Sequence, residues 1–544
     1  MLSISEIRLA AVLVVMLTLP GWAALCVSDI WRQWEGLQRW VVAVGLSIAF
    51  YPVLFYGIRS VLPFLTLGPY KMGAILLLCA AVIAWRMHKH WKQQLKFDRL
   101  EWVAIAVFGM TLFTRFWIIC DHPYPAWSDS LHHALLTRLT AVQGQLPTTM
   151  EPYFPIPLGQ YHLGLYSLTA TTQWLGQVPA HTALLWTAQA LNGLCGLGVY
   201  LVLDRKMGRG GAIVGAVAVG LLSHQPAFYV NWGRFTQLSS QTILLIAWLI
   251  TWGSLEAARL PWLERRASVL WQMSLAAVLN AAVFLLHFRV AVFYLALLGV
   301  TMAWKIWQAR KESWSGRLLL ATAVIGVVSI IAVSPALWEA LQIYISTRLE
   351  YAQLDSTGAA ASESAETIQR FYEFSWNSVP YLVARPWLSY TALLSLSIGI
   401  VRRNKVVLVS VLWAVVLYLL GNAYLTGIAL LSFTNLGAVL IMLYLPIGLT
   451  IGCAAEELTR LSKILGRERA VKTVIVTALV LAFVTSHVRA ADVELYRYFV
   501  TQADVAAMDW IAMNTPEDAL FAVNTYFWLP QAPHGTDAGY WIPY

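Results

Sequence analysis

Fourteen apolar segments, each close to the length that crosses a lipid bilayer, follow one another along this chain of 544 residues. A membrane-spanning helix needs about 20 mainly apolar residues, so the chain is predicted to be an all-α polytopic membrane protein with about 13–14 transmembrane helices. The segments lie near residues 8–27, 39–58, 70–87, 101–120, 182–203, 211–229, 240–256, 271–287, 290–305, 318–337, 386–401, 406–422, 430–452 and 472–488. The first segment lacks a basic n-region, so we expect a retained helix rather than a signal peptide.

The composition supports this class. Only 12% of the residues are charged, whereas soluble domains have about 25%. The 26 tryptophans and 23 tyrosines suit the aromatic belts of a bilayer. The net charge of +9 does not indicate nucleic acid as a partner, because the basic residues fall in short loops between apolar segments, as membrane topology requires.

Six basic clusters set the orientation of the helices, because lysine and arginine collect in cytoplasmic loops. Because Arg99 and Arg205 are expected on the same side, the chain must cross the membrane an even number of times between them. The segments 101–120 and 182–203 already supply two crossings, so residues 161–178, which are rich in Thr, Ser and Gln, are not expected to span. We therefore expect an interfacial helix there, on the outer face. The clusters are Arg86/Lys89/Lys92/Lys96/Arg99, Arg205/Lys206/Arg209, Arg259/Arg265/Arg266, Lys305/Arg310/Lys311/Arg317, Arg402/Arg403/Lys405 and Arg460/Lys463/Arg467/Arg469/Lys472.

This orientation places almost all the histidines on the extracytoplasmic side, and only His88 and His90 on the other. Histidine suits proton and metal chemistry, so the active site is expected to be extracytoplasmic. The outer segments are 121–181, 223–237, 287–289, 338–385 and the tail after 489. We expect three parts: N-terminal transmembrane helices (1–99), a catalytic transmembrane core (100–489) and an extracytoplasmic C-terminal segment (490–544).

The outer loop after the fourth segment begins CDHPYPAWSDSLHHALLTRL, residues 120–139. Ser128 can cap a helix that starts at Asp129, and Gly144 can end it. Asp129, His132 and His133 then share one polar face, opposite a leucine stripe. An amphipathic helix lying on the membrane is predicted, with Trp127 as its interfacial anchor.

Three interpretations of Asp129 remain open. Its carboxylate can simply favour the positive end of the helix dipole. It can act as a general base at the lipid–water boundary. It can also bind a divalent metal, Mg²⁺ or Mn²⁺, together with His132 and His133, although the spacing fixes no further ligand.

Two further stretches carry candidate binding residues. In QLPTTMEPYFPIPLGQYHLGLY (145–166) four prolines exclude a regular helix, and Glu151, Tyr161 and His162 are polar groups of a cleft wall or of a stiff connector. FLLHFRVAVFY places His287 and Arg289 in an apolar run with almost no loop, where a charge is costly unless it is used or paired.

Arg234, in VNWGRFTQ, completes the candidates. It is interpreted either as a substrate-binding residue or as an ordinary interfacial arginine, and the sequence does not decide between the two.

In combination these stretches resemble the GT-C class of integral membrane glycosyltransferases over about residues 100–450. The matching pieces are WSDSLHHA (127–134), PIPLGQYHL (155–163) and LVLDRKMG (201–208). The resemblance implies a GT-C-like bundle, in which the first outer loop carries the catalytic acid at the position of Asp129. It also implies a hexosyl- or pentosyltransferase that uses a polyprenyl-phosphate-linked sugar donor and a glycan, lipid or protein acceptor.

Asp129 would then act as general base in an inverting single displacement. The phosphate leaving group would be stabilised by Arg289, with Arg234 or His287 as further candidates. Two alternatives stay open: a transporter or flippase of lipid-linked saccharides, and a lipid-linked glycan polymerase or ligase. A transporter site should lie near the bilayer midplane, often between inverted repeats, and no convincing repeat is found.

Two outer segments differ in composition from the apolar spans. The stretch ADVAAMDWIAMNTPEDALFAVNT predicts a helix, a turn at Asn514–Thr515–Pro516 and a strand, a small α/β unit that cannot bury a core alone. It either packs on the membrane part or belongs to a longer chain. The Ala/Ser-rich residues 349–376 are interpreted as a linker rather than a lid.

Overall fold

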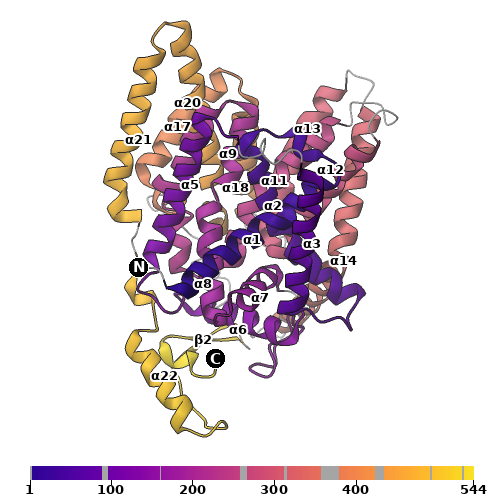
Figure 1. Ribbon diagram of the computed structural model, residues 1–544, viewed down its shortest axis with the longest axis vertical. Coiled ribbons are helices and arrows are strands. Elements are labelled where there is room, and N and C mark those ends of the chain that lie inside the picture. The colour runs from indigo at the N-terminus through magenta and orange to yellow at the C-terminus, as the bar shows by residue number, and fades with distance from the viewer. Residues whose placement is uncertain are drawn as a thin grey trace.

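The computed structural model describes residues 3–88, 96–159, 161–257, 266–310, 315–356, 379–422, 434–490, 493–529 and 532–544. Its helices run between two ends of one bundle (Figure 1). Within these ranges, eleven helices are long and apolar enough to cross a membrane, and two shorter apolar helices accompany them. The expected all-α polytopic class is confirmed.

The N-terminal half supplies α1 (Ile4–Val27), η1 (Ile30–Gln33), α2 (Gly36–Val61), α3 (Pro69–Met87), α5 (Arg99–Ile118), α6 (Ser128–Gln143), α7 (Gly164–Gly176), α8 (Ala180–Leu194), α9 (Leu197–Lys206), α10 (Arg209–Val217), η2 (Ala218–Leu222), η3 (Ala227–Asn231) and α11 (Phe235–Ala257). The C-terminal half supplies α12 (Arg266–Leu286), α13 (Phe288–Ala309), α14 (Ser315–Ser356), α16 (Val379–Val383), α17 (Pro386–Val401), α18 (Lys405–Gly421), α19 (Leu436–Leu440), α20 (Tyr444–Ile464), α21 (Glu468–Ala490), η6 (Leu495–Arg497), α22 (Gln502–Asn514), β1 (Thr525–Leu529), β2 (Ala532–Gly535) and η7 (Ala538–Trp541).

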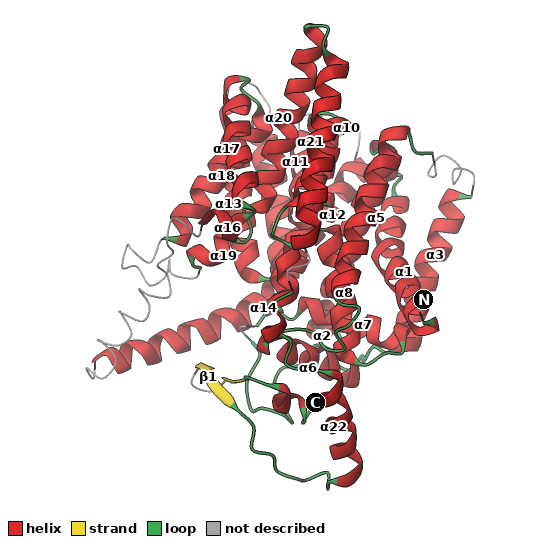
Figure 2. Cartoon of the chain, turned by 90° about the vertical axis from the view of Figure 1, so that its left-hand side faces the viewer, coloured by secondary structure: helices red, strands yellow, loops and turns green. Residues whose placement is uncertain are grey.

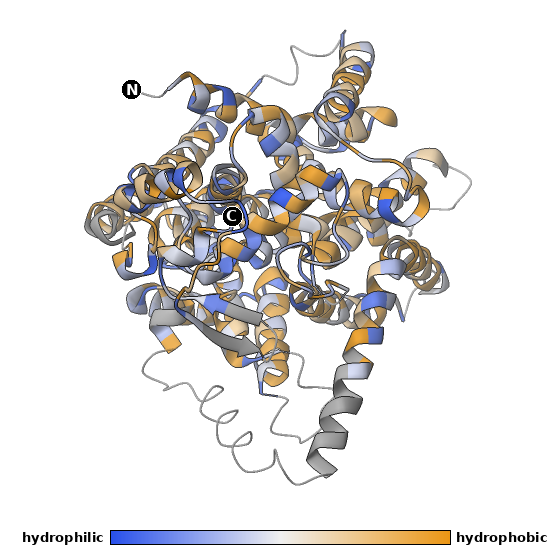
Figure 3. Cartoon of the chain, turned by 90° about the horizontal axis from the view of Figure 1, so that it is seen from below, coloured by the Kyte–Doolittle hydropathy of each residue, from blue (hydrophilic) through white to orange (hydrophobic). Residues whose placement is uncertain are grey.

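The core lies between helices, and large apolar side chains also cover the outside. The middle of the bundle contains α11, whose side chains are almost all buried. By contrast, exposed leucine, valine and tryptophan side chains line α3, α14, α17 and α21. Seen from below (Figure 3), apolar ribbon marks many of the peripheral helices. Apolar surface of this extent on helices is what lipid contact requires.

The basic turns meet at one end of the bundle, the upper end in Figure 1. Arg209, after α9, pairs with Asp98 and Glu101 at the start of α5. Glu256, at the end of α11, pairs with Lys206 of α9 and Lys305 of α13. The expectation that these clusters share a side agrees with these contacts.

The candidate segments gather at the opposite end, where α6, α7 and the C-terminal segment lie (Figure 1). α7 has only 13 residues, too few for a span, so it does not alter the parity of the crossings. α6 packs against α7 and α8, and its leucine stripe, Leu131, Leu135, Leu136 and Leu139, is buried. The expectation that this stripe lies on lipid is therefore wrong, because neighbouring helices cover it.

The outer segment expected at 338–385 begins as helix rather than loop. α14 extends for 42 residues to Ser356 (Figure 2) and keeps Pro335 within it. Residues after the span, such as Leu, Glu, Ala and Gln, are strong helix formers, and Glu339 pairs with Arg59 at the end of α2. Of the predicted linker 349–376, the part after 356 lies outside the described residues.

The C-terminal segment forms the expected helix, α22, and then a hairpin. β1 pairs with β2 in antiparallel register, with Tyr526 opposite His534. The strand begins at Thr525, a few residues later than the sequence predicts. β2 and η7 lie beside α6 (Figure 1), so this unit packs on the membrane part. The division at residues 99 and 489 stays a prediction.

Candidate active site at the α6 end

Asp129 lies in the first turn of α6 with its carboxylate partly exposed. The predicted cap is wrong: the helix begins at Ser128, and Trp127, at φ +69°, is the N-cap residue. Ser128 Oγ instead contacts His534 Nδ1 at 3.0 Å. Gly144, at φ +67°, ends the helix as expected.

The C-terminal segment holds this turn in place. Trp127 N–H donates to the Arg497 carbonyl at 2.8 Å, and the Arg497 guanidinium lies 4.4 Å from the Trp127 ring centre. Trp127 thus anchors this turn to the C-terminal segment, and its place at the membrane interface stays a prediction. His534 Nδ1 also lies 3.9 Å from Asp129 Oδ1, which places an imidazole beside the acid.

The two histidines of α6 point to different neighbours: His132 lies beside His534, as Asp129 does, whereas His133 is buried against α7 and does not share a polar face with Asp129. His132 is half-buried, with its ring 4.8 Å from that of His534 and its Nε2 3.4 Å from the Tyr540 hydroxyl. His133 is buried, and its Nδ1 lies 2.6 Å from the Tyr166 hydroxyl of α7.

This geometry bears on the predicted metal site. A metal ligand needs a free ring nitrogen, but Nδ1 of His133 lies 2.6 Å from the Tyr166 hydroxyl. In the described part of the chain no group of three or more His, Cys, Asp or Glu is placed to hold a metal. Asp129, His132 and His133 therefore do not fit a shared ion, and no step is assigned to one.

The proline-rich loop brings one candidate pair into the site and leaves another residue outside it. The Tyr161 and His162 rings stack with centroids 4.3 Å apart, and His162 Nε2 lies 2.9 Å from the Thr236 hydroxyl of α11. Glu151 is exposed, and none of the contacts described joins its carboxylate to Asp129.

The tight turn between α12 and α13 meets the same loop. The His287 ring lies 4.0 Å from the ring of His162. His287 is the N-cap of α13, and its Nδ1 accepts a hydrogen bond from Val290 N–H at 3.4 Å. Nε2 is then the protonated nitrogen and is available as a donor.

Two arginines act on this histidine pair. Burial first, then His162, Arg289 and Arg234 lower the pKa of His287. Burial, His133 and Arg289 likewise lower the pKa of His162. Both imidazoles are therefore neutral at pH 7, and the permanent positive charge of this region is carried by Arg289 and Arg234.

The acid acts on the other half of the cluster. Burial and then the Asp129 carboxylate raise the pKa of Tyr161. Burial lowers the pKa of His133 to about 4, although Asp129 favours its protonation. The Asp129 carboxylate and the Arg289 guanidinium thus act on one group of neighbouring polar side chains, Tyr161, Tyr166, His133, His162 and His287. A single cavity lined by Asp129, His287 and Arg289 stays a prediction.

Sequence reasoning missed His534, Tyr540, Tyr166 and Gly233. His534 and Tyr540 reach the site through tertiary packing of the C-terminal segment, and no local pattern signals that contact. Gly233 is different, because NWGR contains a turn glycine beside an arginine. At φ +65° a Cβ on Gly233 would collide with Ser130 of α6, so this glycine permits the close approach of the Arg234 turn.

Comparison with solved structures gives the fold, while no protein-family model and no curated protein sequence matches the chain. The archaeal oligosaccharyltransferase AglB from Archaeoglobus fulgidus, solved with an inhibitory peptide and a dolichol-phosphate, superposes with a TM-score of 0.50 at 12% identity. That match covers 76% of this chain and 58% of AglB. This chain therefore spans little more than half the length of AglB.

ArnT from Cupriavidus metallidurans, bound to undecaprenyl phosphate, also has a TM-score of 0.50, at 13% identity. Here 78% of this chain and 83% of ArnT are covered. AglB and ArnT are both GT-C glycosyltransferases. The chain thus has the fold of GT-C membrane enzymes, as the sequence resemblance indicates.

Proposed function

We propose that this protein is a membrane glycosyltransferase that moves a sugar from a polyprenyl-phosphate-linked donor to an acceptor on the extracytoplasmic side of the cell membrane. The observation that carries the proposal is the set of contacts at the α6 end, where the rings of His162 and His287 lie 4.0 Å apart and Tyr161 stacks on His162. The Asp129 carboxylate acts on Tyr161, and Arg289 and Arg234 act on His287. Glycosyl transfer needs both, a proton acceptor and a stabiliser of a departing phosphate.

In the proposed reaction a hydroxyl oxygen of a glycan, lipid or protein acceptor attacks the anomeric carbon of the donor. The bond between that carbon and the phosphate oxygen breaks, and its electron pair stays on the lipid phosphate. Asp129 takes the acceptor's proton. A single displacement of this kind inverts the anomeric configuration.

Arg289 stabilises the developing phosphate charge, and Arg234 adds a second positive charge. Nε2–H of neutral His287 is available as a hydrogen-bond donor to the same group. The His162 ring packs against the His287 ring at a tilt, and its own Nε2 is held by Thr236. Tyr161 stacks on His162.

The basic turns support the proposed side of the membrane. They lie at the end opposite α6 (Figure 1), and basic turns are cytoplasmic in most membrane proteins. Nucleotide sugars are cytosolic, so an outer enzyme requires a lipid-linked donor. Fold likeness to two enzymes solved with polyprenyl phosphates or dolichol-phosphate supports the same donor class.

The test is transfer from a panel of radiolabelled polyprenyl-phosphate sugars by the full chain in nanodiscs, with and without chelator. Asp129→Asn should abolish transfer while donor binding persists. Asp121→Asn removes an exposed carboxylate from the same loop and serves as the matched control. Near-normal turnover by Asp129→Asn would exclude the base, and sugar-lipid translocation without transfer would favour the flippase alternative.

A further inference from the structure

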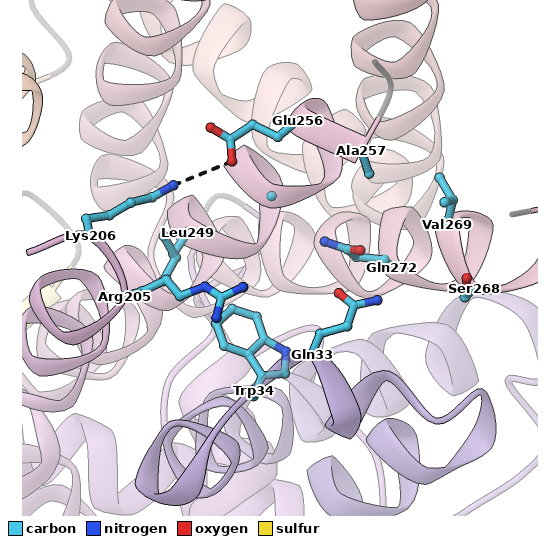
Figure 4. Close-up of a pocket in the computed structure, with 11 residues that line it drawn as sticks. Gln33, Trp34, Arg205, Lys206, Leu249, Glu256, Ala257, Ser268, Val269 and Gln272 are labelled. Atoms are coloured by element: carbon cyan, nitrogen blue, oxygen red, sulfur yellow. Dashed lines mark ion pairs between the residues drawn. The ribbon is translucent and has the colours of Figure 1, made fainter. Parts of the chain in front are cut away.

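At the other end of the bundle a polar cavity of about 240 Å³ lies between the ends of four elements. Figure 4 shows Arg205 and Lys206 from α9, Glu256 from α11, Gln272 from α12, and Gln33 and Trp34 from the η1 turn. This cavity is remote from Asp129, because the basic turns and α6 lie at opposite ends (Figure 1). The proposed transfer reaction does not use it.

The charged residues that line the cavity do not balance, because two are cations, Arg205 and Lys206, and one is an anion, Glu256. Glu256 lies 3.5 Å from Lys206. The exposed guanidinium of Arg205 lies 5.4 Å from the Trp34 ring centre and forms no ion pair within the described residues. The cavity is therefore suited to an anion.

The cavity is also lined by hydrogen-bonding side chains, Gln33, Ser268 and Gln272, and by the apolar Leu249, Ala257 and Val269. The amide of Gln272 is buried and that of Gln33 is exposed (Figure 4). A cavity of about 240 Å³ has room for several waters or for one small polar group. A phosphate with a short polar substituent matches both this volume and the charge.

The position of the cavity favours a lipid as the source of that phosphate. It opens among helix ends at the level of the basic turns, where Trp34 and Trp252 lie against the cations Arg205 and Lys206. Basic pockets between transmembrane helices at this level are typical sites for anionic lipid headgroups. We propose that this cavity binds the phosphate headgroup of an anionic phospholipid from the leaflet on the side of the basic turns.

A lipid headgroup bound in this cavity would contact α9, α11, α12 and the η1 turn at once, and would stabilise their packing. The test uses the full chain in nanodiscs of phosphatidylcholine alone or with added phosphatidylglycerol. Lipid retention is measured by native mass spectrometry and Tm by scanning fluorimetry. The native chain should retain phosphatidylglycerol and gain Tm from it.

Arg205→Gln should weaken phosphatidylglycerol retention about fivefold, the loss expected for one basic group at a membrane surface. Arg205 is exposed, so its replacement should not prevent folding. Lys405→Gln removes one charge from an exposed residue at the same end, outside the cavity. It should leave retention unchanged.

Three outcomes would overturn the proposal. Equal retention by native chain and Arg205→Gln, or equal losses in Arg205→Gln and Lys405→Gln, would show only general attraction of basic residues to an anionic membrane. An Arg205-dependent gain in Tm from inorganic phosphate in phosphatidylcholine discs, with no gain from phosphatidylglycerol, would assign the cavity to a soluble phosphate and reject the lipid.

Discussion

His534 Nδ1 lies 3.9 Å from Asp129 Oδ1, although His534 belongs to β2 near the C-terminus and Asp129 to α6, about 400 residues earlier. The same nitrogen contacts Ser128 Oγ at 3.0 Å. Burial lowers the pKa of His534 and the Asp129 carboxylate opposes that shift, so the ring is neutral at pH 7. The C-terminal hairpin thereby orients the first turn of α6 without neutralising its acid.

Replacing His534 by Gln should lower kcat for sugar transfer about fivefold, because one orienting hydrogen bond is worth about 1 kcal/mol. The donor KM should change little, since the arginines that face the phosphate are untouched. Steady-state transfer assays measure both. His88→Gln, an exposed residue at the opposite end, should have no effect, and an unchanged kcat in His534→Gln would refute the orienting role.

Arg289→Gln should reduce kcat about a hundredfold, since removing one preorganised donor to a developing anion has that effect. Arg289→Lys should recover part of the rate, because the charge returns without the planar fork. Arg234→Gln should have a smaller effect, as Arg234 is exposed and lies over the Trp232 ring. Single-turnover rates with saturating donor measure the loss in each variant. A larger loss in Arg234→Gln than in Arg289→Gln would contradict the prediction.

The membrane spans could be predicted because hydropathy is a local property. Every predicted segment overlaps an observed helix, and the parity of the basic turns identified 161–178 as the segment that does not cross. What failed was the end of α14, because nothing in the sequence marks the bilayer surface once strong helix formers continue past Pro335.

The site was predictable only where topology brings loops to one end. His162 and His287 belong to different loops on the same predicted side, and their rings do meet. The orientation of α6 was not predictable in this way. A leucine stripe looks the same whether lipid or α7 and α8 cover it, and the contacts of His534 and Tyr540 depend on how the C-terminal segment folds back.

Gly233 offers a test of the packing between the NWGR turn and α6. Gly233→Ala places a Cβ against Ser130 Oγ and 3.1 Å from Ser130 N, on a left-handed backbone that costs an L-residue about 1–2 kcal/mol. We expect a lower Tm and a strong loss of transfer. Gly466→Ala is the matched control, because Gly466 has φ +67° with open space around it. Equal transfer rates in the two variants would show that the close approach is not needed.

The buried His133 predicts acid sensitivity of the fold. Its pKa is lowered to about 4 by burial, whereas an unfolded chain has a histidine pKa of about 6.5. Between these values the unfolded chain binds a proton that the native chain does not. The free energy of unfolding therefore keeps its full value above pH 6.5 and decreases as the pH drops towards 4. The loss from this residue is at most about 3 kcal/mol.

The measurement is the Tm of the full chain in nanodiscs, taken in steps between pH 7.5 and 5. This window is chosen because histidines of the unfolded chain titrate within it, at about pH 6.5. His133→Gln should flatten the fall in Tm, because a side chain that cannot titrate replaces the imidazole beside Tyr166. His162 and His287 have lowered pKa values in the same cluster, so part of the dependence should remain. His88→Gln should leave the curve as it is in the native chain. An undiminished fall in His133→Gln would mean that His133 is already protonated or solvated in the folded protein.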